Sequence, residues 1–94
     1  MSFSVEWSKV ATKQLLNIPK KQRLIILYWI QEHLDGCEDP RRAPNGKQLQ
    51  GTDSGWRWRV GVYRILGRIE DGKAVIEVVR VGHRQGVYKN MPRL

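Results

Sequence analysis

The stretch that decides the fold is residues 56–81, WRWRVGVYRILGRIEDGKAVIEVVRV. Apolar and basic residues alternate at its start, where Trp56 and Trp58 point to one side of an extended chain and Arg57 to the other. A period of two is typical of a strand that buries one face. The stretch therefore predicts three strands, over residues 56–60, 62–69 and 74–81.

A two-residue turn is predicted between the second and third of these strands, because they flank the dipeptide Asp71-Gly72. The two strands are then antiparallel neighbours, and Arg64 falls opposite Val79. On a regular ladder this register makes Arg84 face away from Arg64. A bend or bulge at Gly82 would bring the two arginines to one side.

The chain before this stretch predicts a strand and two helices. Residues 2–7 alternate polar and apolar, as a short strand does. Ser8 is a favourable N-cap for a helix over residues 9–16. Pro19 suits the first turn of a second helix, which is expected to run to residue 34 or 35.

Residues 36–46 are rich in Gly and Pro and predict a loop, which carries Arg41 and Arg42. Residues 47–49 are expected to form a brief extended piece. The order of the main elements is therefore β-α-α-β-β-β. We expect an α+β fold, a single domain over residues 1–94, with two N-terminal helices packed on a small, mainly antiparallel sheet.

The charge is the second strong feature of the sequence. Lysine and arginine number 17 against 9 acidic residues, so the net charge is +8. A surplus of this size attracts a polyanion: nucleic acid, an anionic membrane or an acidic protein. Arg57 and Arg59 project from one face of a strand, and Arg64 and Arg68 alternate with apolar residues on the next. Arginines on adjacent strands predict a phosphate-binding surface.

Several other classes of protein find no support. Cys37 is the only cysteine, so no internal disulfide can form, and it lacks companions for a zinc site. We expect neither a metal nor a small-molecule cofactor. Residues 1–7 lack the features of a signal peptide. The longest apolar run, residues 24–30, is far shorter than the roughly 20 residues of a membrane span. A soluble, cytoplasmic protein with no membrane partner is expected.

Three segments together are similar to a known family. They are Leu49-Gln50-Gly51 leading into Trp56-Arg57-Trp58-Arg59-Val60, then Val62-Tyr63-Arg64-Ile65-Leu66, and finally Val81-Gly82-His83-Arg84 followed by Val87-Tyr88. In these segments the chain resembles the RelE-type mRNA interferase toxins of bacterial toxin–antitoxin pairs, within the RelE/ParE superfamily. The resemblance spans nearly the whole chain in element order and length, and it implies two N-terminal helices against a small antiparallel-rich sheet.

The resemblance also implies an activity and two partners. It implies a metal-independent endoribonuclease that cleaves messenger RNA in the ribosomal A site, and a cognate antitoxin that wraps the toxin. An acidic, amphipathic antitoxin would match the basic surface and the apolar second helix. The family's active-site positions fall on Arg57, Arg59, Arg64, Arg84 and Tyr88.

These residue types fit cleavage of RNA by its own 2′-hydroxyl, which attacks the adjacent phosphate. Guanidinium groups stabilise the charge that gathers on the phosphoryl oxygens. We assign Arg64 and Arg84 to the phosphate, with Arg84 nearest the leaving group. Tyr88 is assigned to removal of the 2′-proton, because nearby arginines would stabilise its phenolate.

Two pairs of arginines are assigned to RNA binding alone. Arg57 and Arg59 stand where some family members have lysines, and arginine cannot release its proton at physiological pH. Arg41 and Arg42 add exposed positive charge on the predicted loop. Without lysines at those positions, His83 becomes a second candidate proton carrier.

Other functions share the fold and the charge. A ParE-type toxin inhibits DNA gyrase, although Tyr88 and the arginine pair at 57 and 59 favour the RNA-cutting branch. A non-catalytic RNA-binding homologue would stack bases on exposed tryptophans. A decayed toxin would persist only as an antitoxin-binding or promoter-regulating partner.

Overall fold

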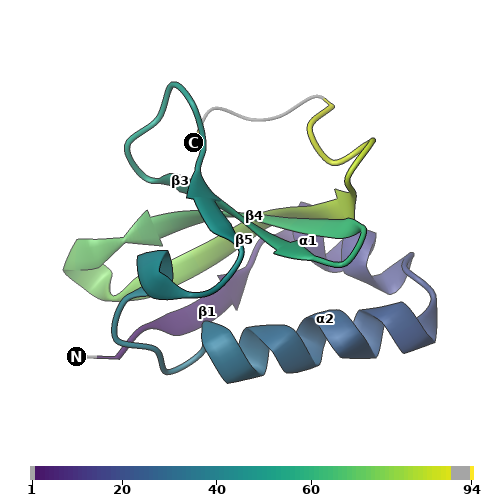
Figure 1. Ribbon diagram of the computed structural model, residues 1–94, viewed down its shortest axis with the longest axis horizontal. Helices are drawn as coiled ribbons and strands as arrows, with labels where there is room; N and C mark the ends of the chain where they lie inside the picture. The colour runs from purple at the N-terminus through teal and green to yellow at the C-terminus, as the bar shows by residue number, and fades with distance from the viewer. Residues whose placement is uncertain (1, 90–93) are drawn as a thin grey trace.

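A five-stranded sheet forms the middle of the protein (Figure 1). The computed structural model describes residues 2–89 and Leu94. The strands lie in the order β1-β5-β4-β3-β2, and β1 is parallel to β5 whereas the other neighbours are antiparallel. Their bounds are Ser4–Trp7 for β1, Gly46–Gln48 for β2, Gly55–Val60 for β3, Tyr63–Glu70 for β4 and Val75–His83 for β5. The predicted α+β fold with a mainly antiparallel sheet is confirmed, and the brief extended piece is the edge strand β2.

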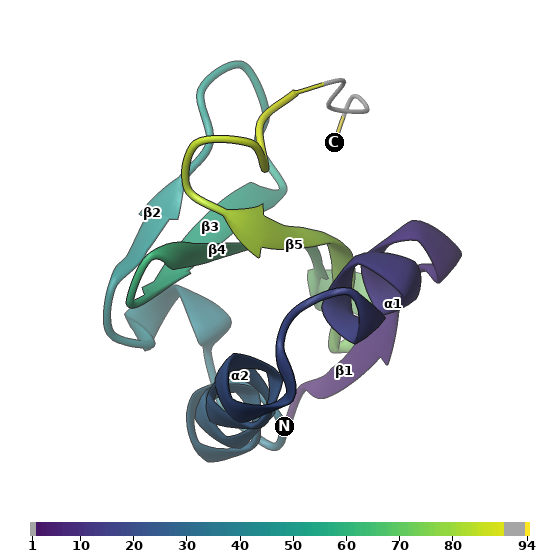
Figure 2. The same ribbon diagram turned by 90° about the vertical axis from the view of Figure 1, so that its right-hand side faces the viewer.

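Two helices, α1 (Lys9–Leu16) and α2 (Lys20–His33), cover one face of this sheet, and Figure 2 shows the C-terminal segment on the other side. Ser8 caps α1 as predicted, since its hydroxyl oxygen accepts a hydrogen bond from the Ala11 N–H at 3.1 Å. No helix within the described part of the chain is long and apolar enough to cross a bilayer. The core between helices and sheet is apolar, and its fully buried members include Ala11, Ile26, Leu34, Trp58, Ile65, Ile76 and Val78.

The two-residue turn predicted at Asp71-Gly72 is wrong. A short 3-10 turn, η2 (Asp71–Lys73), is followed by Ala74 in the left-handed conformation, with φ at 52°. The first residue pair of the hairpin is therefore Glu70 with Val75. The sequence carries no glycine at the left-handed position, which is why the longer turn was not foreseen.

A bulge in β5 adds a second offset to the hairpin. Leu66 pairs with Arg80 but Gly67 pairs with Val78, so Val79 has no partner on β4. A Cβ at Gly67 would lie 3.0 Å from the Trp58 ring and 3.1 Å from the Glu77 carbonyl oxygen. The sheet is thus pressed against the buried tryptophan next to the bulge.

Together the turn and the bulge shift the register by three residues, so that Arg64 lies opposite Gly82 instead of Val79. An odd shift reverses which side chains share a face. The Arg84 N–H donates to the Val62 carbonyl at 2.8 Å, which continues this register one residue past β5. Arg84 therefore falls on the Arg64 side of the sheet, and the irregularity responsible lies at Val79 rather than at Gly82.

A smaller apolar cluster lies on the sheet face away from the helices. Leu66, Val79 and Val87 are buried together there, and Leu49 and Leu94 pack against them. This cluster seats the segment after β5 on the sheet, which positions the residues discussed next.

Candidate functional site

Six basic residues share the sheet face that the helices leave uncovered. Residues paired across antiparallel strands project to the same side. Arg57 pairs with both Lys47 and Leu66, and Leu66 pairs in turn with Arg80. We call this set the basic face, and its members are Lys47, Arg57, Arg59, Arg64, Arg68 and Arg80.

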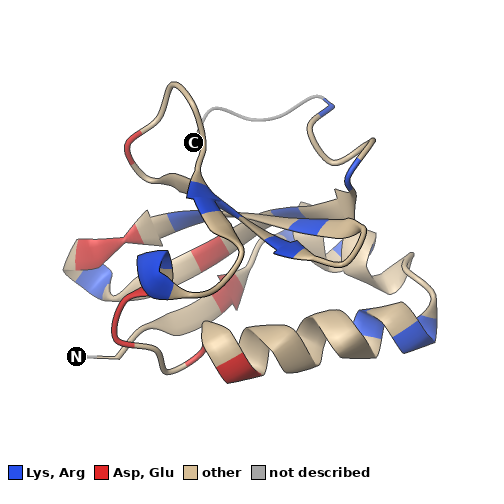
Figure 3. Ribbon diagram, viewed as in Figure 1, with Lys and Arg blue, Asp and Glu red and all other residues tan. Residues whose placement is uncertain are grey.

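Only part of the charge on the basic face is neutralised. Glu77 lies opposite Arg68 on β5 and binds its guanidinium, and this hydrogen bond raises the pKa of Arg68. Figure 3 shows basic residues across the strands, whereas acidic residues gather toward the β4–β5 turn and the nearby loops. Within the described residues no ion pair involves Lys47, Arg57, Arg59 or Arg64. These four cations form a footprint for a polyanion.

A cleft of about 280 Å³ opens at the β2 end of the basic face. Its lining combines cations, amides and a phenol from three separate segments of the chain. It consists of Lys47, Gln48, Leu49, Gln50, Arg57 and Tyr88. A recess with a phenol beside a guanidinium can hold a phosphodiester and can accept a proton from the neighbouring 2′-hydroxyl.

Tyr88 reaches this cleft because the chain folds back after β5. The N–H groups of Gly86 and Val87 both donate to the His83 carbonyl, at 2.9 and 3.0 Å. Val87 is 4% exposed and packs under the turn, next to Gly82. Tyr88 follows directly, stays 42% exposed and lines the cleft.

The structure brings together most of the site residues that the sequence predicted. Arg57, Arg59 and Arg64 lie on neighbouring strands of one face. Arg84 follows the register of Arg64 at the end of β5, and Tyr88 lines the cleft beside Arg57. The Arg64 guanidinium donates to the carbonyls of Gly61 and Tyr63, at 3.1 and 3.0 Å, which holds it over the β3–β4 turn.

His83 is not brought to this site. It pairs with Tyr63, and the two rings meet edge to face on the helix side of the sheet with centroids 6.2 Å apart. Its Nδ1 accepts a hydrogen bond from the Gln85 N–H at 3.2 Å. Because successive strand residues point to opposite faces, His83 lies across the sheet from Arg64.

Arg41 and Arg42 also lie away from the basic face. They belong to the 3-10 turn η1 (Pro40–Arg42), whose Pro40 carbonyl accepts a hydrogen bond from the core residue Trp58 at 3.2 Å. The Arg41 guanidinium binds both carboxylate oxygens of Asp71, at 2.8 and 3.1 Å. This hydrogen bond lowers the pKa of Asp71, so Arg41 ties the loop to the β4–β5 turn.

The sequence alone does not predict that Lys47 and the glutamines on either side of Leu49 line the cleft. The pattern that indicates a strand here is short, because β2 has only three residues, Gly46–Gln48. Alternation over three residues does not say which strand lies alongside. Only the pairing of Lys47 with Arg57 shows that the lysine shares a face with the arginines of β3.

Comparison with known proteins decides the family. The family model of the ParE toxin of type II toxin–antitoxin systems, parDE, matches residues 5–88. The chain is 31% identical to toxin RelG of Mycobacterium tuberculosis over 93 residues, covering 95% of this chain and 99% of RelG. The chain belongs to the RelE/ParE superfamily of toxins. The resemblance inferred from the three sequence segments is confirmed, and the protein is a toxin of the type II toxin–antitoxin class.

Solved structures of this superfamily share the fold of the toxin. The RelE–RelB complex from Pyrococcus horikoshii OT3 matches with a TM-score of 0.73 and 25% identity, covering 93% of this chain and 100% of the other. The RelB–RelE antitoxin–toxin complex from Methanococcus jannaschii matches with a TM-score of 0.70 and 26% identity, covering 93% and 99%. Both relatives were solved in complex with RelB, which is the antitoxin of the Methanococcus complex.

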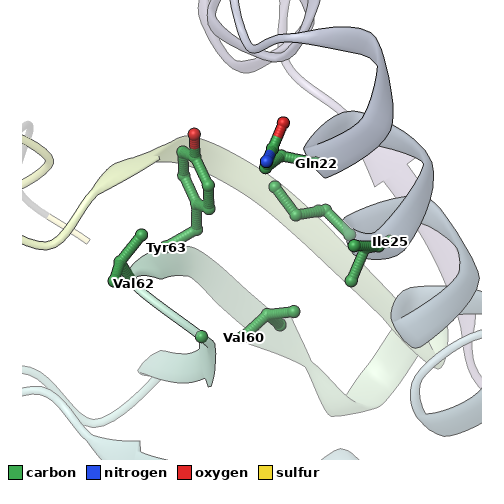
Figure 4. A pocket seen from close by; sticks show the side chains of 7 residues that line it. Gln22, Ile25, Val60, Val62 and Tyr63 are labelled. Carbon is green, nitrogen blue, oxygen red and sulfur yellow. The ribbon is translucent and has the colours of Figure 1, made fainter.

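The toxin has a second recess, on the helix side of the sheet. This apolar groove, about 150 Å³ in volume, lies between α2 and the β3–β4 turn (Figure 4). Ile25 lines it from α2 and Val62 from the β3–β4 turn, and the two residues are 51% and 45% exposed. Exposed apolar side chains continue along α2 beyond the groove, at Leu24, Leu27 and Tyr28. A stripe of this kind is unusual on a lone protein and typical of a protein-binding surface.

Proposed function

We propose that this toxin is an endoribonuclease that cleaves messenger RNA in the ribosomal A site and thereby inhibits translation. The observation that carries the proposal is the cleft in which Tyr88 lies beside Arg57, on the face that also presents Arg59 and Arg64. Ribosome-bound mRNA is the substrate, and the reaction needs no metal.

The 2′-hydroxyl of the substrate attacks the adjacent phosphorus, and Tyr88 takes the 2′-proton. Negative charge gathers on the phosphoryl oxygens in the transition state. Arg64 and Arg84 bind these oxygens, and Arg57 and Arg59 hold the flanking phosphates. The products are a 2′,3′-cyclic phosphate and a 5′-hydroxyl. Since His83 lies on the opposite face, Tyr88 carries the base role in this scheme.

The cleft is shallow and open, so it grips little of a flexible RNA strand. The ribosome would supply the in-line geometry of the 2′-oxygen, the phosphorus and the 5′-oxygen. Cleavage of free RNA is therefore expected to be much slower than cleavage of mRNA in programmed ribosomes.

The cognate antitoxin is proposed to be an acidic, amphipathic chain whose apolar side chains enter the groove beside α2. The complexes of the Pyrococcus and Methanococcus relatives with RelB support a partner of this class. Ile25 and Val62 offer the apolar contact, and Lys20, Lys21 and Arg23 at the start of α2 offer charge to acidic residues.

End-mapping of mRNA on programmed ribosomes tests the cleavage function. The wild type is expected to cut within the A-site codon, and Tyr88→Phe, which keeps the ring but loses the hydroxyl, to cut about 100-fold more slowly or worse. The rival function, inhibition of DNA gyrase, agrees with the match to the ParE family model. A supercoiling assay run in parallel separates the two: gyrase inhibition without loss of translation would refute the ribonuclease proposal.

A further inference from the structure

The proposed reaction requires an acid as well as a base. When the bond between phosphorus and the 5′-oxygen breaks, the leaving oxygen must take up a proton. Neither the arginines of the basic face nor Arg84 can release one at physiological pH. His83 faces the other side of the sheet, and Tyr88 is already occupied with the 2′-proton.

Lys47 is the remaining side chain of the cleft that can carry this proton. It lines the same recess as Tyr88 and pairs directly with Arg57 across β2 and β3. It is exposed, and none of the described carboxylates forms an ion pair with it. The other lining groups are two amides and an aliphatic chain, none of which is a Brønsted acid in water.

The strand that carries Lys47 is firmly seated. A Cβ at Gly46 would lie 2.7 Å from the Trp56 Nε1 and 2.9 Å from the Trp58 Cδ1, so only glycine lets β2 approach this closely. On the other side, the Gln48 side-chain amide donates to the Thr52 carbonyl at 3.0 Å. The backbone of Lys47 is therefore held from both sides, which suits a residue that must meet one atom of the substrate.

We propose that Lys47 is the general acid of the toxin, and this rests on the proposed ribonuclease function. The 2′-oxygen forms its bond to phosphorus as its proton passes to the Tyr88 phenolate. The bond from phosphorus to the 5′-oxygen breaks, and that oxygen takes a proton from the Lys47 ammonium. The amine that remains regains a proton from water, and the Tyr88 hydroxyl returns its proton to water. A lysine ammonium is protonated at neutral pH and far more acidic than the alcohol that leaves.

A substrate whose leaving group needs no proton tests this role. The scissile position is first mapped with the wild type, and an mRNA is then made with sulfur in place of the 5′-oxygen at that linkage. Lys47→Met should cleave the ordinary mRNA on ribosomes about 100-fold more slowly than wild type, or worse, but the sulfur-linked mRNA at a rate close to wild type. Sulfur leaves as a stable thiolate, so the acid becomes dispensable.

Three further variants separate acid catalysis from simple charge. Lys47→Arg keeps the charge but cannot release the proton, so it should lose as much on the ordinary mRNA as Lys47→Met. Arg64→Met should be slow on both substrates. Lys73→Met, in the β4–β5 turn, removes one positive charge outside the cleft and should match wild type.

The outcomes distinguish a failure of the acid role of Lys47 from a failure of the proposed ribonuclease function. Equal losses of Lys47→Met on the two substrates, or full activity of Lys47→Arg, would overturn the acid role while the ribonuclease function stands. A wild type that cleaves neither mRNA would overturn the function itself.

Discussion

The basic face and the apolar groove lie on opposite sides of one strand, and neighbouring residues of β4 serve each of them. Arg64 projects to the basic face, while Tyr63 projects to the helix side and lines the groove. The first surface carries four cations, Lys47, Arg57, Arg59 and Arg64, that form no ion pair with a described carboxylate. The second is apolar and flanked by the lysines that begin α2. Alternation along a single strand thus presents a cationic surface on one side of the sheet and an apolar groove on the other. A partner in the groove need not touch the cleft, so mutations can test the two surfaces separately.

The largest separable effect is expected at Arg64. Arg64→Met removes a cation from the basic face, and loss of one preorganised donor to a developing oxyanion typically costs about 100- to 1000-fold in rate. End-mapping on ribosomes measures the loss, while antitoxin affinity should stay at the wild-type value. Arg42→Met is the matched control, because its side chain is 88% exposed in η1 and lies on neither surface. A similar loss of cleavage in Arg42→Met would show that total charge, not position, matters.

A smaller effect is expected at Ile25, where antitoxin affinity should fall while the cleavage rate stays the same. Ile25→Asp places a charge in the apolar groove and forfeits burial of a side chain worth about 1.5–3 kcal/mol, so antitoxin affinity should fall about 10- to 100-fold. Titration calorimetry with the cognate antitoxin measures this. Cleavage should be unchanged, and Gln31→Asp supplies the same charge on the same helix outside the groove lining. Wild-type affinity in Ile25→Asp would place the antitoxin elsewhere.

The smallest effect is expected at the ion pair that belongs to neither surface. Arg41 lowers the pKa of Asp71 below 3.8, so the carboxylate contributes stability above that value and loses it as pH falls through the lowered pKa. Asp71→Asn should therefore melt slightly earlier than wild type near neutral pH, and the difference should vanish in acid below the lowered pKa. Thermal melts followed by circular dichroism test this. A difference that persists in strong acid would assign the effect to the turn rather than to the ion pair.

The sequence predicts the helices and strands correctly, but it does not predict the register in which β4 and β5 pair. The alternation around Trp56 and Trp58 correctly predicted a strand with arginines on its outer side. The Asp71-Gly72 dipeptide did not set the turn, because Ala74 adopts the left-handed conformation despite its Cβ. The bulge at Val79 then reversed the parity of β5. Neither departure has a local signal in the sequence.

The candidate site likewise has a part that the sequence predicts and a part that depends on strand pairing. The charge surplus and the arginines at 57, 59 and 64 follow from composition and period, which are properties of short stretches of chain. The separation of His83 from Arg84, and the meeting of Lys47 with Tyr88, depend on strand pairing and on how Val87 packs under the C-terminal turn. The sequence by itself determined which faces are basic and which are apolar, because side-chain alternation is local. Only the tertiary structure decided which residues share the cleft, because a register shift of one residue moves every side chain of a strand to the other face.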